Sequence, residues 1–204
     1  MLAVLPDGST VRATDFRFVP RVPAAVLAMH TVLRVLADET QAADQSLVQA
    51  VLDYWEVADR ETLWRLGSHG FLANPADYVG RMGGMAPLVT AAAVQGSPLA
   101  RAICDRTVDE IWLGIHLVGR CCHASQVPRI LHGSVIQSSY FSAAMARTNT
   151  LPMNQRYVIQ PIPVTPVVAA VLLAVEQADI SLDHDDLVRL TEAMLTSTGN
   201  SSPP

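Results

Sequence analysis

Residues 127–135 of this 204-residue chain read Val-Pro-Arg-Ile-Leu-His-Gly-Ser-Val. Residues 127–131 read as a short strand, and a small-residue turn from His132 to Val135 follows it directly. A helical pattern then runs from about Ser138 to Arg147, and residues 157–160 read as a second short strand. Strand, glycine turn, helix and strand in this order predict an α/β arrangement.

The turn is also the strongest candidate for a binding site. Glycine has no Cβ, so a ligand can approach its backbone closely, and the N-terminus of the following helix favours phosphate. These two properties predict a nucleotide site at Gly133, Ser134 and Val135. Most turns of this kind only connect two elements, so plain connection stays open as the alternative.

The chain before this unit predicts a hairpin and then a block of helices. Two short runs, 2–5 and 10–14, flank a Pro-Asp-Gly turn, which is typical of a β-hairpin. Apolar residues recur at helical spacing through a block at 22–122. We predict its helices at 23–38, from Asp44 or Ser46 past Trp55, at 60–66, from 74 to 94 with a break near Gly83 and Gly84, and at 97–120.

After the second strand the sequence predicts more helix. Residues 167–177 form an apolar helical run, 181–196 read as a terminal helix of acidic residues and leucines, and 197–204 as a disordered tail. We therefore expect a single domain at 1–196, in which 127–178 form the nucleotide-binding subdomain.

Composition excludes several classes of function. Half of the residues are hydrophobic and 16% are charged, which excludes a disordered chain. The net charge of −5 argues against a nucleic-acid partner. All fourteen basic residues are Arg, so lysine chemistry such as a Schiff base is excluded.

The sequence also bears on the compartment. Three cysteines, two of them adjacent, form no disulfide framework, and the N-terminus does not read as a signal peptide; both point to the cytoplasm. Residues 157–175 carry no charge, but three prolines interrupt them, so we expect no membrane span.

Other groups of reactive side chains have simpler structural explanations. Cys121-Cys122-His123 lacks a partner pair at zinc-ligand spacing and reads as a helix end with half-buried thiols. The cluster at 183–186 is typical of a solvated helix N-terminus, although it could hold a metal. His30 and His116 lie in apolar helices and read as packed or boundary histidines. The carboxylates of 105, 109 and 110 lie within reach of Arg101 and Arg106, which favours a surface charge network over an acid–base pair.

Several segments together resemble one family. Residues 86–89 and 91–100 resemble a helix pair of the BadF/BadG-type ATPases and N-acetylglucosamine kinase-like proteins. Residues 131–135 resemble the family's adenosine turn, 163–174 resemble its Pro-rich C-terminal helix, and the N-terminal hairpin has a counterpart there. The resemblance is colinear over residues 1 to about 178.

The resemblance implies the C-terminal domain of a ribonuclease H-like (actin-like) ATPase, with a large helical insertion. It further implies ATP and Mg²⁺ as cofactors and an amino sugar as the phosphate acceptor. The family's phosphate loop and catalytic aspartate have no counterpart in this sequence. The chain also has Ser134 and Ala169 where the family has glycines, and Ser97 where it has aspartate.

Two functions follow as expectations. The first is an ATP-binding domain that transfers phosphate to a sugar only when a missing N-terminal domain completes it. The second is a non-catalytic relative whose former domain interface, rich in apolar residues, is buried in a homodimer.

Overall fold

The computed structural model of the chain describes residues 2–5, 7–12, 24–71, 74–160 and 189. The chain divides into two compact units, residues 1–159 and 160–204. Only Gln160 and Arg189 of the second unit belong to the described residues, so the account below concerns the first unit. The predicted helices at 167–177 and 181–196, and the tail at 197–204, lie outside the described residues.

The N-terminal hairpin is confirmed. Strand β1 (Leu2–Val4) pairs antiparallel with β2 (Thr10–Arg12), and Leu2 lies opposite Arg12. In the turn, the backbone N–H and the hydroxyl of Ser9 both donate to Asp7 Oδ1, over 2.9 and 2.6 Å. Gly8 has φ +80°, a conformation that glycine adopts without the steric cost of a Cβ.

The helical block is confirmed as well, with boundaries close to those expected. Its elements are α1 (Ala24–Leu36), a 3₁₀ turn η2 (Ala42–Asp44), α2 (Gln45–Tyr54), α3 (Arg60–Ser68), α4 (Pro75–Gly84), α5 (Ala86–Gln95) and α6 (Pro98–Gly119). The predicted break near Gly83 and Gly84 is the junction of α4 and α5.

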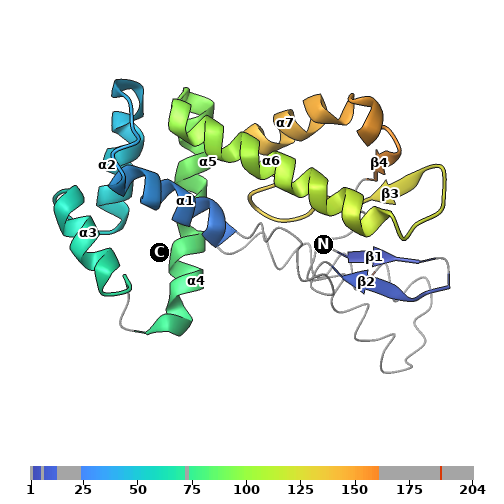
Figure 1. The fold of residues 1–204 in the computed structure, drawn as a ribbon, viewed down its shortest axis with the longest axis horizontal. Coiled ribbons are helices and arrows are strands. Elements are labelled where there is room, and N and C mark those ends of the chain that lie inside the picture. The colour runs from blue at the N-terminus through green and yellow to red at the C-terminus, as the bar shows by residue number, and fades with distance from the viewer. Residues whose placement is uncertain (1, 6, 13–23, 72–73, 161–188, 190–204) are drawn as a thin grey trace. The chain divides into compact units, whose positions relative to one another are not determined.

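Helix α1 is central to this block. It contacts α3, α4, α5 and α6 (Figure 1). Its buried face consists of Leu27, Ala28, Thr31, Val32 and Val35, the three-to-four-residue spacing that one side of a helix gives. The apolar side chains among them belong to one continuous core that extends to Phe141 and Tyr157 in the C-terminal part of the unit.

The start of α6 is fixed by local and distant groups. Gly96 ends α5 with φ +100°, and the Ser97 hydroxyl accepts from the Ala100 N–H over 3.1 Å as the N-cap of α6. The buried carboxylate of Asp44 accepts from the Ser97 hydroxyl at 2.6 Å and from the Leu99 N–H at 3.0 Å. Asp44, expected as a cap of α2, therefore joins the beginnings of α2 and α6.

The α/β unit is present but small. Strand β3 (Val127–Arg129) is followed by α7 (Ser139–Asn149), a 3₁₀ turn η3 (Pro152–Asn154) and β4 (Tyr157–Ile159). The strands β3 and β4 pair in parallel, with Val127 opposite Tyr157. Helix α7 packs on α5 and α6.

The expected fold class is correct only in part. The described residues are mostly helical, with two sheets of two strands each. Within those residues there is no larger sheet of the ribonuclease H-like type. The reason is that each of the four described strands has only three residues, while most of the described residues between β2 and β3 are helical.

Candidate functional site

The predicted nucleotide turn lies between β3 and α7. Gly133 has φ +125°, a value that side-chain-bearing residues rarely adopt. A Cβ built on Gly133 would meet no heavy atom within 4 Å, so the space beside this backbone is open. The Gly133 carbonyl accepts from the Gln137 N–H over 3.0 Å, which closes the turn. Ser134 and Val135 lie in this turn, so the structure brings all three predicted residues together.

The N-terminus of α7 has no side-chain cap. The Ser138 hydroxyl donates to the Val135 carbonyl over 2.7 Å and makes no bond to an N–H of the first helical turn. Such a helix start keeps its N–H groups and the positive end of its dipole available to an anion. The first turn of α7, which begins four residues after Val135, therefore offers backbone N–H groups to a ligand.

The charge of this part of the chain favours the same kind of ligand. Residues 111–160 contain four Arg and three His but no Asp or Glu. The same segment therefore has nothing with which to hold Mg²⁺, which prefers carboxylate oxygens. Sequence reasoning missed this asymmetry because it used the net charge of the whole chain.

Helix α7 is tied to α6 by polar contacts next to this site. The Tyr140 hydroxyl donates to Asp105 Oδ1 over 2.9 Å, and Arg147 lies 3.8 Å from the same oxygen. Burial, together with the hydrogen bond to Asp105 and its charge, raises the pKa of Tyr140 to about 12. Tyr140 therefore stays protonated near neutral pH and acts as a structural donor.

Arg129, the last residue of β3, is a buried cation that sequence reasoning missed. It is only 8% exposed, and its guanidinium lies 4.3 Å from the centre of the Trp112 ring. Its Nε donates to the Tyr157 carbonyl and its Nη2 to Asn149 Oδ1, over 3.2 and 2.7 Å, while Nη1 has no partner in the described part of the chain. Burial lowers the pKa of Arg129. Because its partners lie at the end of α7 and the start of β4, Arg129 holds the unit together rather than facing the turn.

The Cys121–Cys122 pair lies just beyond the end of α6, and both thiols are half-buried. The guanidinium of Arg156 donates to the Cys122 carbonyl, which fixes this end of the helix. In the part of the chain that the structure describes, no three His, Cys, Asp or Glu side chains are grouped so that they could hold a metal. The acidic cluster at 183–186 lies outside that part.

Several of the remaining titratable candidates have structural partners. Arg106 pairs with Glu110, as the expected charge network requires, but Arg101 donates to the Ala93 carbonyl instead. His116 bonds Asn154 Oδ1 over 2.8 Å and stacks on the Tyr157 ring. These contacts explain the positions of Arg101, Arg106 and His116 as structural, with no need for a catalytic role.

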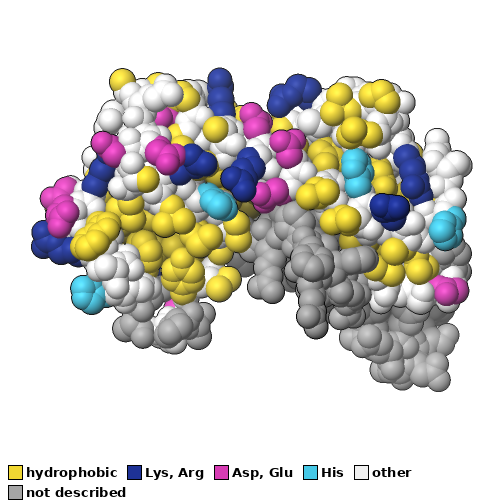
Figure 2. All heavy atoms as spheres, in the orientation of Figure 1, with side chains coloured by type: hydrophobic (Ala, Val, Ile, Leu, Met, Phe, Trp, Pro, Cys, Tyr) yellow, Lys and Arg dark blue, Asp and Glu magenta, His cyan; other side chains and the backbone are white. Residues whose placement is uncertain are grey.

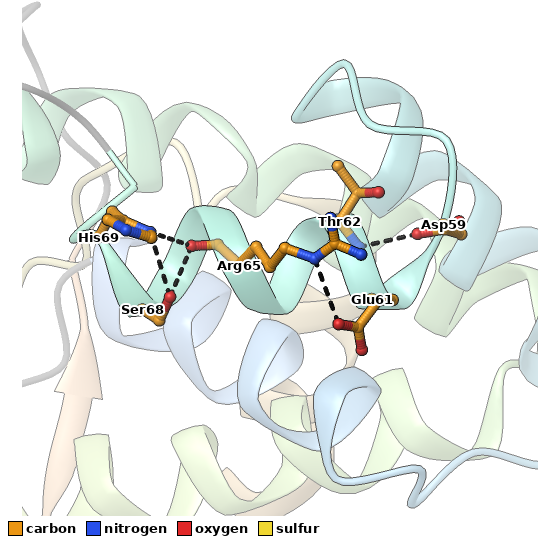
Figure 3. Close-up of polar contacts among 6 residues, drawn as sticks. All are labelled: Asp59, Glu61, Thr62, Arg65, Ser68 and His69. Carbon is orange, nitrogen blue, oxygen red and sulfur yellow. Dashed lines mark hydrogen bonds and ion pairs between the residues drawn. The ribbon is translucent and has the colours of Figure 1, made fainter.

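Helix α3 brings a serine and a histidine together (Figure 3), but not as a catalytic pair. Ser68 Oγ lies 3.2 Å from His69 Nδ1, yet the hydroxyl donates to the Arg65 carbonyl. His69 Nδ1 lies 2.8 Å from that same carbonyl, so it must carry a proton to bond it. A protonated Nδ1 cannot accept the proton of Ser68. Asp59 lies at the other end of the helix, where it caps the Thr62 N–H.

Comparisons with known proteins assign no family. No protein-family model matches the chain, and no curated protein matches it either. Among the helices of the described residues, none combines the length and apolarity that crossing a bilayer requires.

Proposed function

We propose that the chain binds an adenine nucleotide at Gly133, Ser134 and Val135, as a C-terminal-type domain of the BadF/BadG and N-acetylglucosamine kinase-like ATPases. The observation that carries the proposal is the parallel β3–α7–β4 unit, whose open glycine turn leads into an uncapped helix. The ribonuclease H-like fold belongs to the same proposal.

The chemistry of the turn supports a nucleotide rather than a neutral ligand. Backbone N–H groups at a helix N-terminus bind phosphate oxygens, and residues 111–160, which contain the turn, have no carboxylate. Asp105 of α6 does reach the first turn of α7, where it is paired with the Tyr140 hydroxyl and with Arg147. The open space beside Gly133 allows a close approach of the ligand to the backbone. Mg²⁺ has no ligands in this segment, so the residues do not fit the metal and nucleotide binding should not depend on it.

Phosphoryl transfer to an amino sugar would need more than this site. Transfer relies on positioned phosphates, metal-held charge and a base. The resemblance assigns the phosphate loop and the catalytic aspartate to a further domain. We therefore propose binding for this chain, and turnover only for an assembly that includes that domain.

Calorimetry on the full chain tests the proposal. We expect heat of binding with ATP and with ADP, and the same affinity with and without Mg²⁺. Gly133→Ala should weaken binding, because the new Cβ enters the open space and disfavours the positive φ. Gly70→Ala is the matched control: Gly70 has φ +89° and equally open surroundings at the end of α3. Absence of heat at millimolar nucleotide, or equal losses in both variants, would overturn the proposal.

A second function, a non-catalytic protein that forms a homodimer, is favoured by exposed apolar side chains. Leu33, Trp64 and Val79 on α1, α3 and α4 are 51, 56 and 62% exposed. Figure 2 shows hydrophobic side chains gathered over one part of the helical block. Patches of this kind on a protein surface mark interaction sites. Sedimentation at several concentrations tests the idea, and a monomer throughout would contradict it.

A further inference from the structure

A small crevice between α1 and α6 lies outside the proposed nucleotide turn. It has a volume of about 90 Å³ and is lined by His30, Arg34, Ala102, Ile103, Arg106, Thr107 and Glu110. At about 30 Å³ per water molecule, this is room for about three waters, or for one small ion of several atoms. The crevice is too small for a nucleotide.

The two arginines of the crevice each use only one of their nitrogen donors. Among the described residues, Arg34 donates from Nη1 to Glu39, and Arg106 donates from Nε to Glu110 over 3.1 Å. A guanidinium has five N–H donors in a flat fork that matches the oxygens of carboxylate and phosphate. Each arginine therefore keeps unused donors, and the two come from different helices.

The other lining residues complete an arrangement suited to an anion. His30 lies one helical turn before Arg34 and has no hydrogen-bond partner among the described residues. The Thr107 hydroxyl donates to the Ile103 carbonyl over 2.8 Å, so it stays fixed in place. Glu110 is the one carboxylate of the lining, against two arginines. Glu39, which pairs with Arg34, does not line the crevice, so the lining itself has one more positive than negative charge.

We propose that this crevice binds a small oxyanion, either free phosphate or the phosphate of a small phosphomonoester, held between Arg34 and Arg106 with His30 as a further donor. Phosphate matches better than a carboxylate, because its tetrahedral oxygens can reach donors on both helices at once, whereas a planar carboxylate matches one guanidinium. The inference is independent of the proposed nucleotide turn.

The experiment is a titration of the full chain with inorganic phosphate at constant ionic strength, followed through the histidine ring signals by nuclear magnetic resonance. We expect saturable shifts of the His30 signal, identified by their absence in His30→Gln. Arg34→Gln and Arg106→Gln should each weaken phosphate binding at least about tenfold. Both side chains are well exposed, 43 and 63%, so these variants should fold.

Two further variants make the result specific. Ala102→Met fills the crevice without removing any charge and should also abolish binding, which a general attraction to positive charge would not predict. Arg65→Gln removes an arginine of similar exposure that pairs with Glu61 on α3, and it should leave binding unchanged.

Acetate and glycerol phosphate distinguish the class of anion. We expect glycerol phosphate to bind like free phosphate and acetate to bind more weakly. Linear, unsaturable shifts in the wild-type chain would overturn the proposal, as would equal weakening by Arg65→Gln or undiminished binding by Ala102→Met. Tighter binding of acetate would overturn its assignment to phosphate.

Discussion

Asp44 offers the sharpest test of how the helical block is held together. Its carboxylate is 1% exposed and accepts three hydrogen bonds, from the Ser97 hydroxyl, the Leu99 N–H and, over 2.8 Å, the Gln41 N–H. We predict that Asp44→Ala will destabilise the protein strongly, whereas Asp44→Asn will have a smaller effect. Asparagine keeps an oxygen for Ser97 and Leu99 but presents an NH₂ group to the Gln41 N–H.

The magnitude follows from the donors left unpaired. A hydrogen bond to a charged group contributes about 1.5–3 kcal/mol, and a buried donor without a partner loses its solvation as well. Three donors lose their acceptor in Asp44→Ala, two of them at buried residues. We therefore expect a loss of about 3–5 kcal/mol in the free energy of unfolding. Asp44→Asn should lose about 1–2 kcal/mol. Two of the three hydrogen bonds remain, but at the third the asparagine NH₂ group faces the Gln41 N–H, which is also a donor.

The pH dependence provides a second signature. Burial acts to raise the pKa of Asp44, but the hydrogen bonds from Ser97, Gln41 and Leu99 outweigh it and hold the pKa below the ordinary value of 3.8. A group with a depressed folded-state pKa stabilises the protein above its unfolded-state pKa, and this contribution is lost as the pH falls through the folded-state value. The stability difference between wild type and Asp44→Asn should therefore be constant near neutral pH and shrink below about pH 4.

Urea unfolding followed by the fluorescence of the buried Trp55 and Trp112 measures both effects. Asp53→Ala is the control, because Asp53 is an exposed residue of the same helix α2 whose carboxylate, among the described residues, accepts a hydrogen bond only from Gln49. It should change stability by less than about 0.5 kcal/mol. If Asp44→Ala lost less than about 1 kcal/mol, or no more than Asp53→Ala, the reasoning would be refuted.

Two further predictions concern close packing and thiol reactivity. In Gly119→Ala the new Cβ would lie 2.5 Å from the ring of the buried Tyr157, so thermal unfolding should show a loss of about 1–3 kcal/mol. Gly80→Ala, whose Cβ meets nothing within 4 Å inside α4, should instead stabilise by about 0.5–1 kcal/mol, and equal effects of the two changes would contradict this account. Burial raises the pKa of Cys104 to about 12, so a thiol reagent at pH 8 should label the Cys121–Cys122 pair quickly and Cys104 only after unfolding. Rapid labelling of three thiols in the folded protein would count against the buried position of Cys104.

The helices were predictable from sequence because their ends depend on neighbouring residues. Ser97 and Pro98 mark the start of α6, and Gly96 marks the end of α5, through bonds and backbone conformations that span only a few residues. The turn at Gly133 was predictable for the same reason, since a glycine between a strand and a helix is a local signal. The elements of residues 24–160 therefore follow the pattern of the sequence closely.

Other features depend on contacts between distant segments and have no local signal. Asp44 was expected to cap its own helix, but its carboxylate bonds residues more than fifty positions away. The burial of Arg129 requires Trp112 and Tyr157 from two other elements. The crevice of His30, Arg34 and Arg106 exists only because α1 packs on α6. The expected larger sheet rested on the family resemblance, and the described strands are too short to supply it.

The absence of acidic residues from 111–160 gives the described residues an uneven distribution of charge. Residues 24–110 carry six Arg against eleven Asp and Glu, whereas 111–160 carry four Arg and no acid. The net charge of −5 sums over the whole chain and describes neither of these two parts. Of these two parts, an anionic surface attracts the one that contains β3, α7 and β4, and a cationic surface attracts the helical block. Salt at physiological concentration screens this attraction beyond about 8 Å, so it acts only close to the surface.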